Sequence, residues 1–410
     1  MHFKQDHIYI GVDLHKETHT AVMINCWSET IGEIQIENKP SAFPKLINKV
    51  KKHAKGLIPI FGLEDVGGFG RSLAVFLLDK GQIVKEVNSA LSHSQRMSYP
   101  TTKKSDSWDA YCVACVLLAR LKELPNANPQ DVYWTLAQVV NRRDALVKAM
   151  TALTNQLHNQ LSYHYPSYKK FFSDPIGQTA LAFWDVYPSP HILNGATVEE
   201  LAELLRRNSH NACSTNKAKK ILELATKDGD TTRDYQDMRD FLIKSIVRDI
   251  RFKQEEIEET KKALKQMLNI IGHQLETMPG IDTVTAAALI SKIGDIRRFK
   301  NSDKLARFSG IAPVKFSSAG KGTNKKSKQG NRGLHGVFYF LAIQQIQVAK
   351  GSKLPRNPVF YEYYQRKVQE GKTKVQALIY VMRRLVNIIY GMMKNKTAYR
   401  MPTLLKEEAM

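Results

Sequence analysis

Cysteine is scarce in this chain. The 410 residues contain four cysteines, Cys26, Cys112, Cys115 and Cys213, too few and too scattered for a disulfide framework, so we expect a reducing compartment. Cys112 and Cys115 have the spacing of half a zinc site, but no second Cys/His pair lies at zinc-finger spacing. Both lie within the apolar run 111–118, which favours buried helix cysteines over zinc ligands.

Long apolar runs are absent as well. None approaches the roughly 20 residues that a membrane-spanning helix needs. The opening residues, MHFKQDHIYIGVD, lack the charged and then apolar segments of a secretory signal. We therefore expect a soluble, cytoplasmic protein without a membrane partner. The hydrophobic content of 43% suffices for substantial cores, and the length indicates two or three domains.

Acidic residues become rare toward the C-terminus. Residues 291–410 hold 25 Lys and Arg against 6 Asp and Glu, whereas the first 290 residues hold 36 against 33. Because each Lys or Arg that neutralises a phosphate releases condensed counterions, this concentration of positive charge predicts a nucleic-acid partner. The alternative is a solubilising surface, which gives no reason to gather the charge in one part of the chain.

Strand and helix signals alternate between residues 7 and 121. Three strands that can form a meander come first, and helices and strands then alternate, which predicts a mixed sheet flanked by helices. This is also the element order of the ribonuclease H-like fold. The expected strands are 8–13, 18–26, 31–37, 57–63 and 82–87, and the expected helices are 42–52, 71–78 and 106–121.

Two long helical patterns follow. Apolar residues repeat in heptads within 131–163, and a second heptad line consists of Ile243, Ile250, Ile257, Leu264 and Ile271. These helices predict a coiled coil, either within one chain or between the subunits of a dimer or tetramer. Residues 165–230 between them indicate short helices and loops. The predicted fold class is α/β plus all-α, with domains at 1–125, 126–275 and 276–410.

The last predicted domain is basic and helical and opens with MPGIDTVTAAALISKIG, residues 278–294. Its Pro-Gly turn before an Ala/Ile/Leu-rich helix resembles half of a helix-hairpin-helix. Such an element presents backbone N–H groups and helix N-termini to DNA phosphates without reading bases. A plain helix-turn-helix core remains an alternative.

Four acidic residues stand at positions that suggest chemistry. Asp13 ends the first expected strand and Glu64 the fourth, while Asp106 and Asp109 lie three apart near a helix start and share one face. Four converging carboxylates would repel one another unless a cation neutralised them, and Mg²⁺ prefers such oxygens. Two such ions can stabilise the attacking and leaving oxygens of a phosphodiester. Singly, each acid has another explanation: Asp106 can cap its helix, as can Ser105, and Asp65 can replace Glu64, although strand alternation turns Asp65 away.

These acids belong to longer motifs: GVDLHK around Asp13, GLEDVGGFG around Glu64, K-x-D-x-x-D-A from Lys104 to Ala110, and a distal block from MPGID through FSGIAPVKFSSAGKG to KQGNRGLHG. In their order and content the chain resembles the DEDD recombinases of bacterial insertion sequences, which include the Piv and MooV invertases and the bridge-RNA-guided transposases. The motifs lie at both ends of the chain, with a coiled-coil pattern between them as in that family.

The resemblance implies a RuvC-like tetrad of Asp13, Glu64, Asp106 and Asp109 and a nucleophilic serine in the C-terminal domain. The family pattern of proline, a serine five residues on and then glycine fits Ser318, with alanine in place of the glycine, so that Ser317 remains an alternative. It also implies a guide RNA that selects the donor and target DNA.

Basic residues surround this serine among glycines, in a segment too polar to form a core. We expect them to contact phosphates of DNA or RNA, with solvated loop charge as the alternative. His15 and Lys16, just after Asp13, are further candidates to approach the scissile phosphate. The basic residues are Lys315, Lys321, Lys325, Lys326, Lys328 and Arg332.

The predicted function is a transposase or site-specific recombinase that cuts and rejoins double-stranded DNA through Ser318, assisted by Mg²⁺ at the tetrad. An alternative is a metal-dependent nuclease of the junction-resolvase type, in which water attacks and the serine is incidental. A third possibility is a nucleic-acid scaffold without enzymatic activity, whose carboxylates are ordinary surface residues.

Overall fold

The chain forms two compact units, Met1–Val132 and Tyr133–Met410, here called the N-terminal and the C-terminal unit and described separately. The computed structural model describes residues 3–65, 67–100, 105–129, 132–318, 321–325 and 330–401, and within 314–318 and 321–325 it describes the course of the backbone. None of the helices within these ranges is long and apolar enough to cross a lipid bilayer.

The N-terminal unit is built on a mixed five-stranded sheet in the order β3-β2-β1-β4-β5. Strand β1 pairs antiparallel with β2 and parallel with β4, so it is the central strand of the sheet. All five predicted strands are confirmed, and no bound differs by more than two residues. They are β1 (His7–Leu14), β2 (Thr18–Ile24), β3 (Thr30–Glu37), β4 (Ile58–Glu64) and β5 (Ile83–Glu86).

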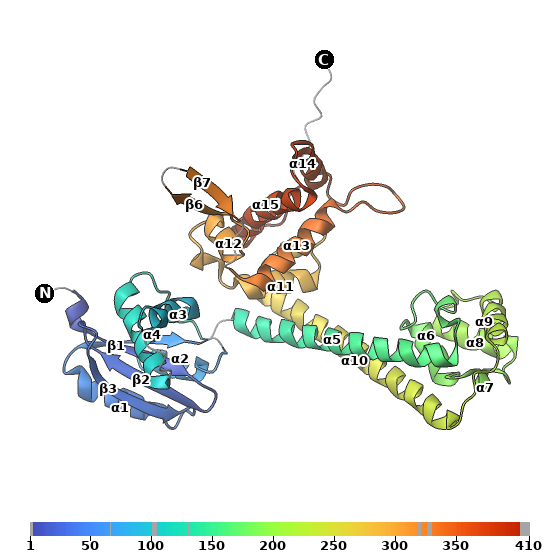
Figure 1. The fold of residues 1–410 in the computed structure, drawn as a ribbon, viewed down its shortest axis with the longest axis horizontal. Coiled ribbons are helices and arrows are strands. Elements are labelled where there is room, and N and C mark those ends of the chain that lie inside the picture. The colour runs from blue at the N-terminus through green and yellow to red at the C-terminus, as the bar shows by residue number, and fades with distance from the viewer. Residues whose placement is uncertain are drawn as a thin grey trace, which may run out of the picture. The chain divides into compact units, whose positions relative to one another are not determined.

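Helices cover both faces of this sheet (Figure 1). Side chains of alternate residues in β1 accordingly enter different cores. Ile8, Ile10 and Val12 pack with α1 and α2, whereas Tyr9 packs with α4. The helices of this unit are η1 (Phe3–Asp6), α1 (Phe43–Ala54), α2 (Arg71–Asp79), α3 (Ser89–Met97) and α4 (Asp106–Arg120).

Helix α4 confirms the interpretation of the two spaced cysteines. Cys112 and Cys115 are free and buried thiols of α4, and Cys115 belongs to the hydrophobic core between this helix and the sheet. Burial raises the pKa of Cys112 to about 12, so the thiolate that a zinc site requires is disfavoured. The two cysteines are therefore core residues.

The first part of the C-terminal unit consists of two long helices that meet in a small helical core. Leu157 and Leu161 from the end of one share a hydrophobic cluster with Ile243 and Val247 from the start of the other, around the buried ring of Trp184. The elements are α5 (Val132–His164), η2 (Tyr168–Lys170), α6 (Gln178–Val186), α7 (Pro190–Leu193), α8 (Val198–Asn208), α9 (Thr215–Asp228) and α10 (Gln236–Ile271).

These elements confirm the two predicted helices and the short helices between them. Helices α5 and α10 also lie next to one another within one chain, and an ion pair of 3.2 Å joins Arg142 to Glu256 (Figure 1). Four of the five heptad positions predicted on α10 are buried, and Ile257 is half-buried. Whether the same helices join subunits stays a prediction.

The rest of the C-terminal unit is a helical bundle around α15. Val381, Leu385 and Ile389 of this helix are fully buried, and α12, α13 and α14 pack against it (Figure 1). The elements are η3 (Leu275–Thr277), α11 (Thr283–Ile293), η4 (Ile296–Arg298), α12 (Ser302–Phe308), β6 (Val314–Ser318), β7 (Lys321–Lys325), α13 (Arg332–Ile346), α14 (Pro358–Gln369) and α15 (Lys374–Asn395).

One segment of this bundle differs from the expectation. The serine-bearing stretch was expected to be a polar loop, but β6 and β7 form a two-stranded antiparallel hairpin in which Ser318 is opposite Lys321. Alternation of apolar and polar residues in Val-Lys-Phe-Ser suits a strand, and the long polar continuation hid this short signal.

Candidate active site

The sheet places two of the predicted acids next to one another. Asp13 of β1 and Glu64 of β4 are directly opposite in the parallel register. Alternation puts Asp13 on the face of β1 that Tyr9 shares, and Glu64 on the face of β4 that Ile60 shares. Both faces pack against α4, so the two carboxylates emerge at the same sheet edge, on the α4 side.

Gly11 determines how closely α4 approaches these strand ends. A Cβ atom at this position would lie 2.1 Å from the backbone oxygen of Ala110 and 2.3 Å from the backbone nitrogen of Ala114. Only glycine therefore allows this contact between β1 and α4. The first turn of α4, which contains Asp106 and Asp109, is thereby held beside Asp13.

The start of α4 is held by a cap that is not one of the four acids. The Ser105 hydroxyl accepts a hydrogen bond from the backbone N–H of Trp108. The sequence left open that Asp106 caps this helix, but Ser105 takes that position. The carboxylate of Asp106 is half-exposed and available to other partners.

Two nitrogen-bearing side chains bridge the four carboxylates in pairs. Nε2 of His15 lies 3.0 Å from Oδ2 of Asp13 and 3.5 Å from Oδ1 of Asp106. Nη1 of Arg96 lies 3.2 Å from Oδ1 of Asp109 and 4.0 Å from Oε2 of Glu64. The structure thus brings all four predicted acids into one cluster and adds a histidine and an arginine to it.

Burial and charge together affect Asp13. Burial is the largest cause that raises the pKa of its carboxyl group, and the nearby Asp109 and Asp106 carboxylates raise it further. The neighbouring His15 acts in the opposite direction. The carboxylates of the cluster are therefore close enough to repel one another, as converging metal ligands do before a cation binds.

The donor set suits a hard divalent cation. Asp13, His15 and Asp106 can each offer one ligand atom, and these atoms lie within 4.8 Å of one another. Oδ1 of Asp109 is buried and has no hydrogen-bond partner. Carboxylate oxygens of this kind are the ligands that Mg²⁺ prefers.

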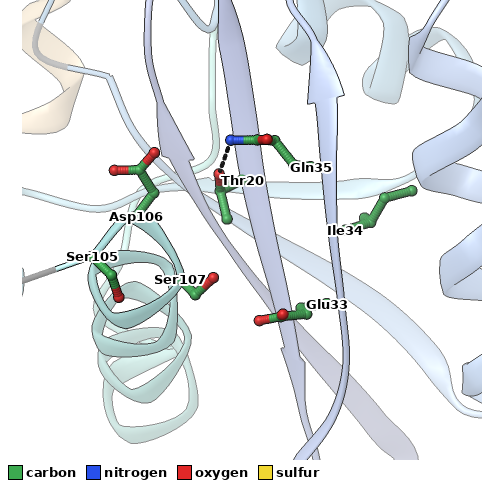
Figure 2. A pocket seen from close by; sticks show the side chains of 7 residues that line it. All are labelled: Thr20, Glu33, Ile34, Gln35, Ser105, Asp106 and Ser107. Atoms are coloured by element: carbon green, nitrogen blue, oxygen red, sulfur yellow. Dashed lines mark hydrogen bonds between the residues drawn. The ribbon is translucent and has the colours of Figure 1, made fainter.

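A polar hollow adjoins this cluster. It has a volume of about 570 Å³ and lies between the first turn of α4 and strands β2 and β3. Figure 2 shows Asp106, Ser105 and Ser107 on the helix side, and Thr20, Glu33 and Gln35 on the strand side. Thr20 is the residue of β2 opposite Asp13, and Asp106 is the member of the carboxylate cluster that lines the hollow.

Comparison with known proteins identifies the family of the chain. A family profile described as a transposase of the DEDD type matches residues 10–166, and one described as a transposase of the IS116/IS110/IS902 family matches residues 272–365. The chain belongs to the IS110/IS116/IS900 family of transposases. It is therefore a DNA-processing enzyme of the transposase and recombinase class.

Relatives of this transposase come from several bacteria. An uncharacterized 44.8 kDa protein of insertion element IS116 from Streptomyces clavuligerus is 24% identical, over 97% of this chain and 98% of that protein. A 42 kDa protein of IS900 from Mycobacterium paratuberculosis shows the same identity and coverage. The pilin gene-inverting protein of Moraxella lacunata is 32% identical over 32% of this chain and 39% of that protein.

The sequence analysis did not identify Arg96 as a residue of the site, because it did not predict helix α3. The stretch SALSHSQRM has three serines and a weak apolar pattern, and Ser92 is its only fully buried residue. A usable signal was present in Asn88, whose side chain caps the helix by accepting a hydrogen bond from the backbone N–H of Ala90. The contact of Arg96 with Glu64 depends on tertiary packing and left no local signal.

Two neighbours of the cluster have structural roles. The Asp65 carboxylate accepts a hydrogen bond from the backbone N–H of Gly70, which orders the loop before α2. The Asn38 side chain donates to the backbone oxygens of Lys16 and Phe69, and so joins the β1–β2 turn to that loop. His15 lies in the same turn and was named from the sequence as a candidate to approach the scissile phosphate. Its imidazole contacts the carboxylates of Asp13 and Asp106 directly.

The serine and basic residues of the transposase belong to the C-terminal unit. Ser318 ends β6, and Ser317 is opposite Gly322 in the hairpin. The hairpin also carries Lys315, Lys321 and Lys325. Arg332 is the first residue of α13, where Asn331 caps the helix, and the predicted contacts Lys326 and Lys328 lie outside the described residues.

Proposed function

We propose that this transposase cuts and rejoins double-stranded DNA at a Mg²⁺ site formed by Asp13, Glu64, Asp106 and Asp109, with Ser318 as the nucleophile. The observation that carries the proposal is the convergence of these four carboxylates at the carboxyl ends of β1 and β4 and the first turn of α4. The sheet order and the flanking helices support a ribonuclease H-like fold of the RuvC type for the N-terminal unit.

The cluster offers what a divalent ion needs. Asp13 and Asp106, two of the four carboxylates, can present ligand atoms within 4.8 Å of one another, and a buried oxygen of Asp109 has no hydrogen-bond partner. When bound, Mg²⁺ supplies positive charge against the oxygens of a scissile phosphate. The four carboxylates hold and orient this site, and the half-exposed Asp106 faces the hollow through which DNA approaches.

The serine reaction conserves the energy of the phosphodiester. Oγ of Ser318 forms a bond to phosphorus, the bond from phosphorus to one sugar oxygen breaks, the serine proton passes to a base, and the leaving oxygen takes up a proton. A hydroxyl on another DNA end then reverses these steps and frees the serine. His15 is a candidate proton carrier, because its imidazole lies at the exposed side of the carboxylate cluster.

The decisive experiment compares Asp13→Asn with Ser318→Ala on a labelled DNA substrate in Mg²⁺. We expect both variants to lose strand exchange, Asp13→Asn by at least about a hundredfold. In the wild type, a covalent protein–DNA band should survive denaturation and yield phosphoserine at Ser318. If Ser318→Ala cleaves normally while Asp13→Asn does not, a water-using nuclease replaces the recombinase.

Ser317→Ala is the matched control, since it removes a hydroxyl from the adjacent residue of β6. It should retain the covalent band. Mixing Ser318→Ala with Asp13→Asn then tests assembly: recovered activity means that the serine of one subunit serves the carboxylates of another, as a dimer or tetramer through α5 and α10 would allow.

The basic C-terminal unit is the proposed nucleic-acid interface. Its Lys315, Lys321, Lys325 and Arg332 would contact phosphates, and substitution of each by Gln should weaken binding and lower the salt dependence. We also propose a guide RNA, which sequencing of RNA that co-purifies with the full chain tests. A reducing, cytoplasmic setting agrees with four free cysteines.

A further inference from the structure

Arg96 occupies an unusual place for a cation in a metal site. Its guanidinium lies between Glu64 and Asp109, two of the proposed ligands, at 4.0 Å and 3.2 Å from their nearest carboxylate oxygens. Both carboxylates are largely buried, with 11% and 12% of their side-chain surface exposed. Two buried negative charges need a positive partner, and Arg96 is the one that the described residues provide.

The contacts of Arg96 are nevertheless loose. Charge-assisted hydrogen bonds between nitrogen and oxygen are typically about 2.7–2.9 Å long, shorter than either contact here. Oδ1 of Asp109, only 3.2 Å from the guanidinium, has no hydrogen bond of acceptable geometry. Arg96 thus supplies charge to this pair but does not satisfy the oxygen atoms.

A divalent cation would satisfy them better. Mg²⁺ binds carboxylate oxygens at about 2.0–2.1 Å and carries two charges, whereas Arg96 offers one charge at a greater distance. The guanidinium cannot stay between the two carboxylates once both hold such an ion. Arg96 can leave, because its side chain is 26% exposed and it lies in the last turn of the short helix α3.

We propose that Arg96 stands in for a cation in the ion-free protein and must withdraw from Glu64 and Asp109 before the metal site is complete. Arg96 is then a positioning residue that keeps the empty cluster assembled and competes with the ion. This inference rests on the proposed function of the tetrad. It predicts that the apparent affinity for the ion is reduced by the fraction of molecules in which Arg96 is bound to the carboxylates.

Direct ion binding tests the competition. Mn²⁺ binding to the full chain, freed of metal with EDTA, is measured by calorimetry for the wild type, Arg96→Gln, Arg96→Lys and Arg120→Gln. We expect Arg96→Gln to bind Mn²⁺ about three- to tenfold more tightly, with Arg96→Lys between it and the wild type. Arg120→Gln is the charge-matched control, since it breaks an exposed ion pair with Glu123 in the same unit, and should bind like the wild type.

Thermal unfolding supplies a second readout. In EDTA, Arg96→Gln should unfold at a lower temperature than the wild type, because two carboxylates lose their cation. Saturating Mn²⁺ should remove this difference in unfolding temperature. If the difference in unfolding temperature persists in saturating Mn²⁺, Arg96 supports the metal-bound site and does not leave it. Equal or weaker Mn²⁺ binding by Arg96→Gln would also overturn the proposal.

Asp13→Asn separates this inference from the proposed function. If the wild type binds Mn²⁺ and Asp13→Asn does not, the metal site stands, and the Arg96 variants alone decide whether the arginine competes. If the wild type binds no Mn²⁺ in a manner that depends on Asp13, the metal site itself is wrong, and the role assigned to Arg96 is wrong with it.

Discussion

The proposed carboxylates and the proposed serine are held in very different ways. Asp13 and Glu64 end neighbouring strands inside a five-stranded sheet, and α4 is locked against them at Gly11. Ser318 ends a strand of a two-stranded hairpin. An isolated hairpin of two strands is only marginally stable, whereas a larger sheet that is covered by helices on both faces is stable by itself. The proposed carboxylates are therefore held by a larger and better covered sheet than the proposed serine.

The largest expected effect comes from a substitution that disrupts the contact between β1 and α4 beside the carboxylates. Gly11→Val should lower the free energy of unfolding of the N-terminal unit by at least about 3 kcal/mol, because its side chain would collide with the backbone of α4 at Ala110 and Ala114. Urea denaturation measures the change. Gly62→Ala, on the next strand, meets only the side chains of Leu117 and Val87 and should cost much less. Equal losses would show that the backbone contact is unimportant.

A smaller effect concerns buried histidines, one in the N-terminal unit and two in the C-terminal unit. Burial is the main cause that lowers the pKa of His19, His164 and His273 below 6.5. The folded protein keeps them neutral, while the unfolded chain takes up protons once the pH falls below about 6.5. Their contribution to stability is complete above that pH and is lost as the pH falls toward their lowered values.

His273 should show this most clearly, since neither of its ring nitrogens has a hydrogen-bond partner. Lowering the pH from 7.5 to 5 should reduce the free energy of unfolding with a slope of at most about 1.4 kcal/mol per pH unit for each histidine. His273→Phe should flatten the pH dependence of the C-terminal unit. An unchanged slope in His273→Phe would refute the assignment.

The smallest expected effect is a gain in stability in the C-terminal unit. Gly336 lies within α13, and a Cβ atom there would meet nothing within 4 Å. Gly336→Ala should therefore stabilise the unit by about 0.5–1 kcal/mol, because alanine loses less backbone entropy in a helix. Thermal unfolding measures the shift. A loss of stability would mean that this glycine is required, as Gly11 is.

Local pattern was sufficient for much of the fold. Every strand of the N-terminal sheet and both long helices follow from apolar periodicity, and burial of Cys112 and Cys115 follows from the apolar run around them. The hairpin β6–β7 and the helix α3 did not follow, because each has a short or weak apolar pattern within a polar segment. The local signals that they carry, the alternation in β6 and the Asn88 cap of α3, are too short to stand out from the polar residues around them.

The sequence by itself determined that Asp13 and Glu64 end strands and that Asp106 and Asp109 share one helix face, since both facts depend on periodicities of a few residues. Only the tertiary structure decided which strands are neighbours, that Gly11 lets α4 approach them, and that His15 and Arg96 bridge the carboxylates in pairs. The physical reason is range: strand alternation and helix pitch act over a few residues, whereas packing and charge act between residues that only folding brings together.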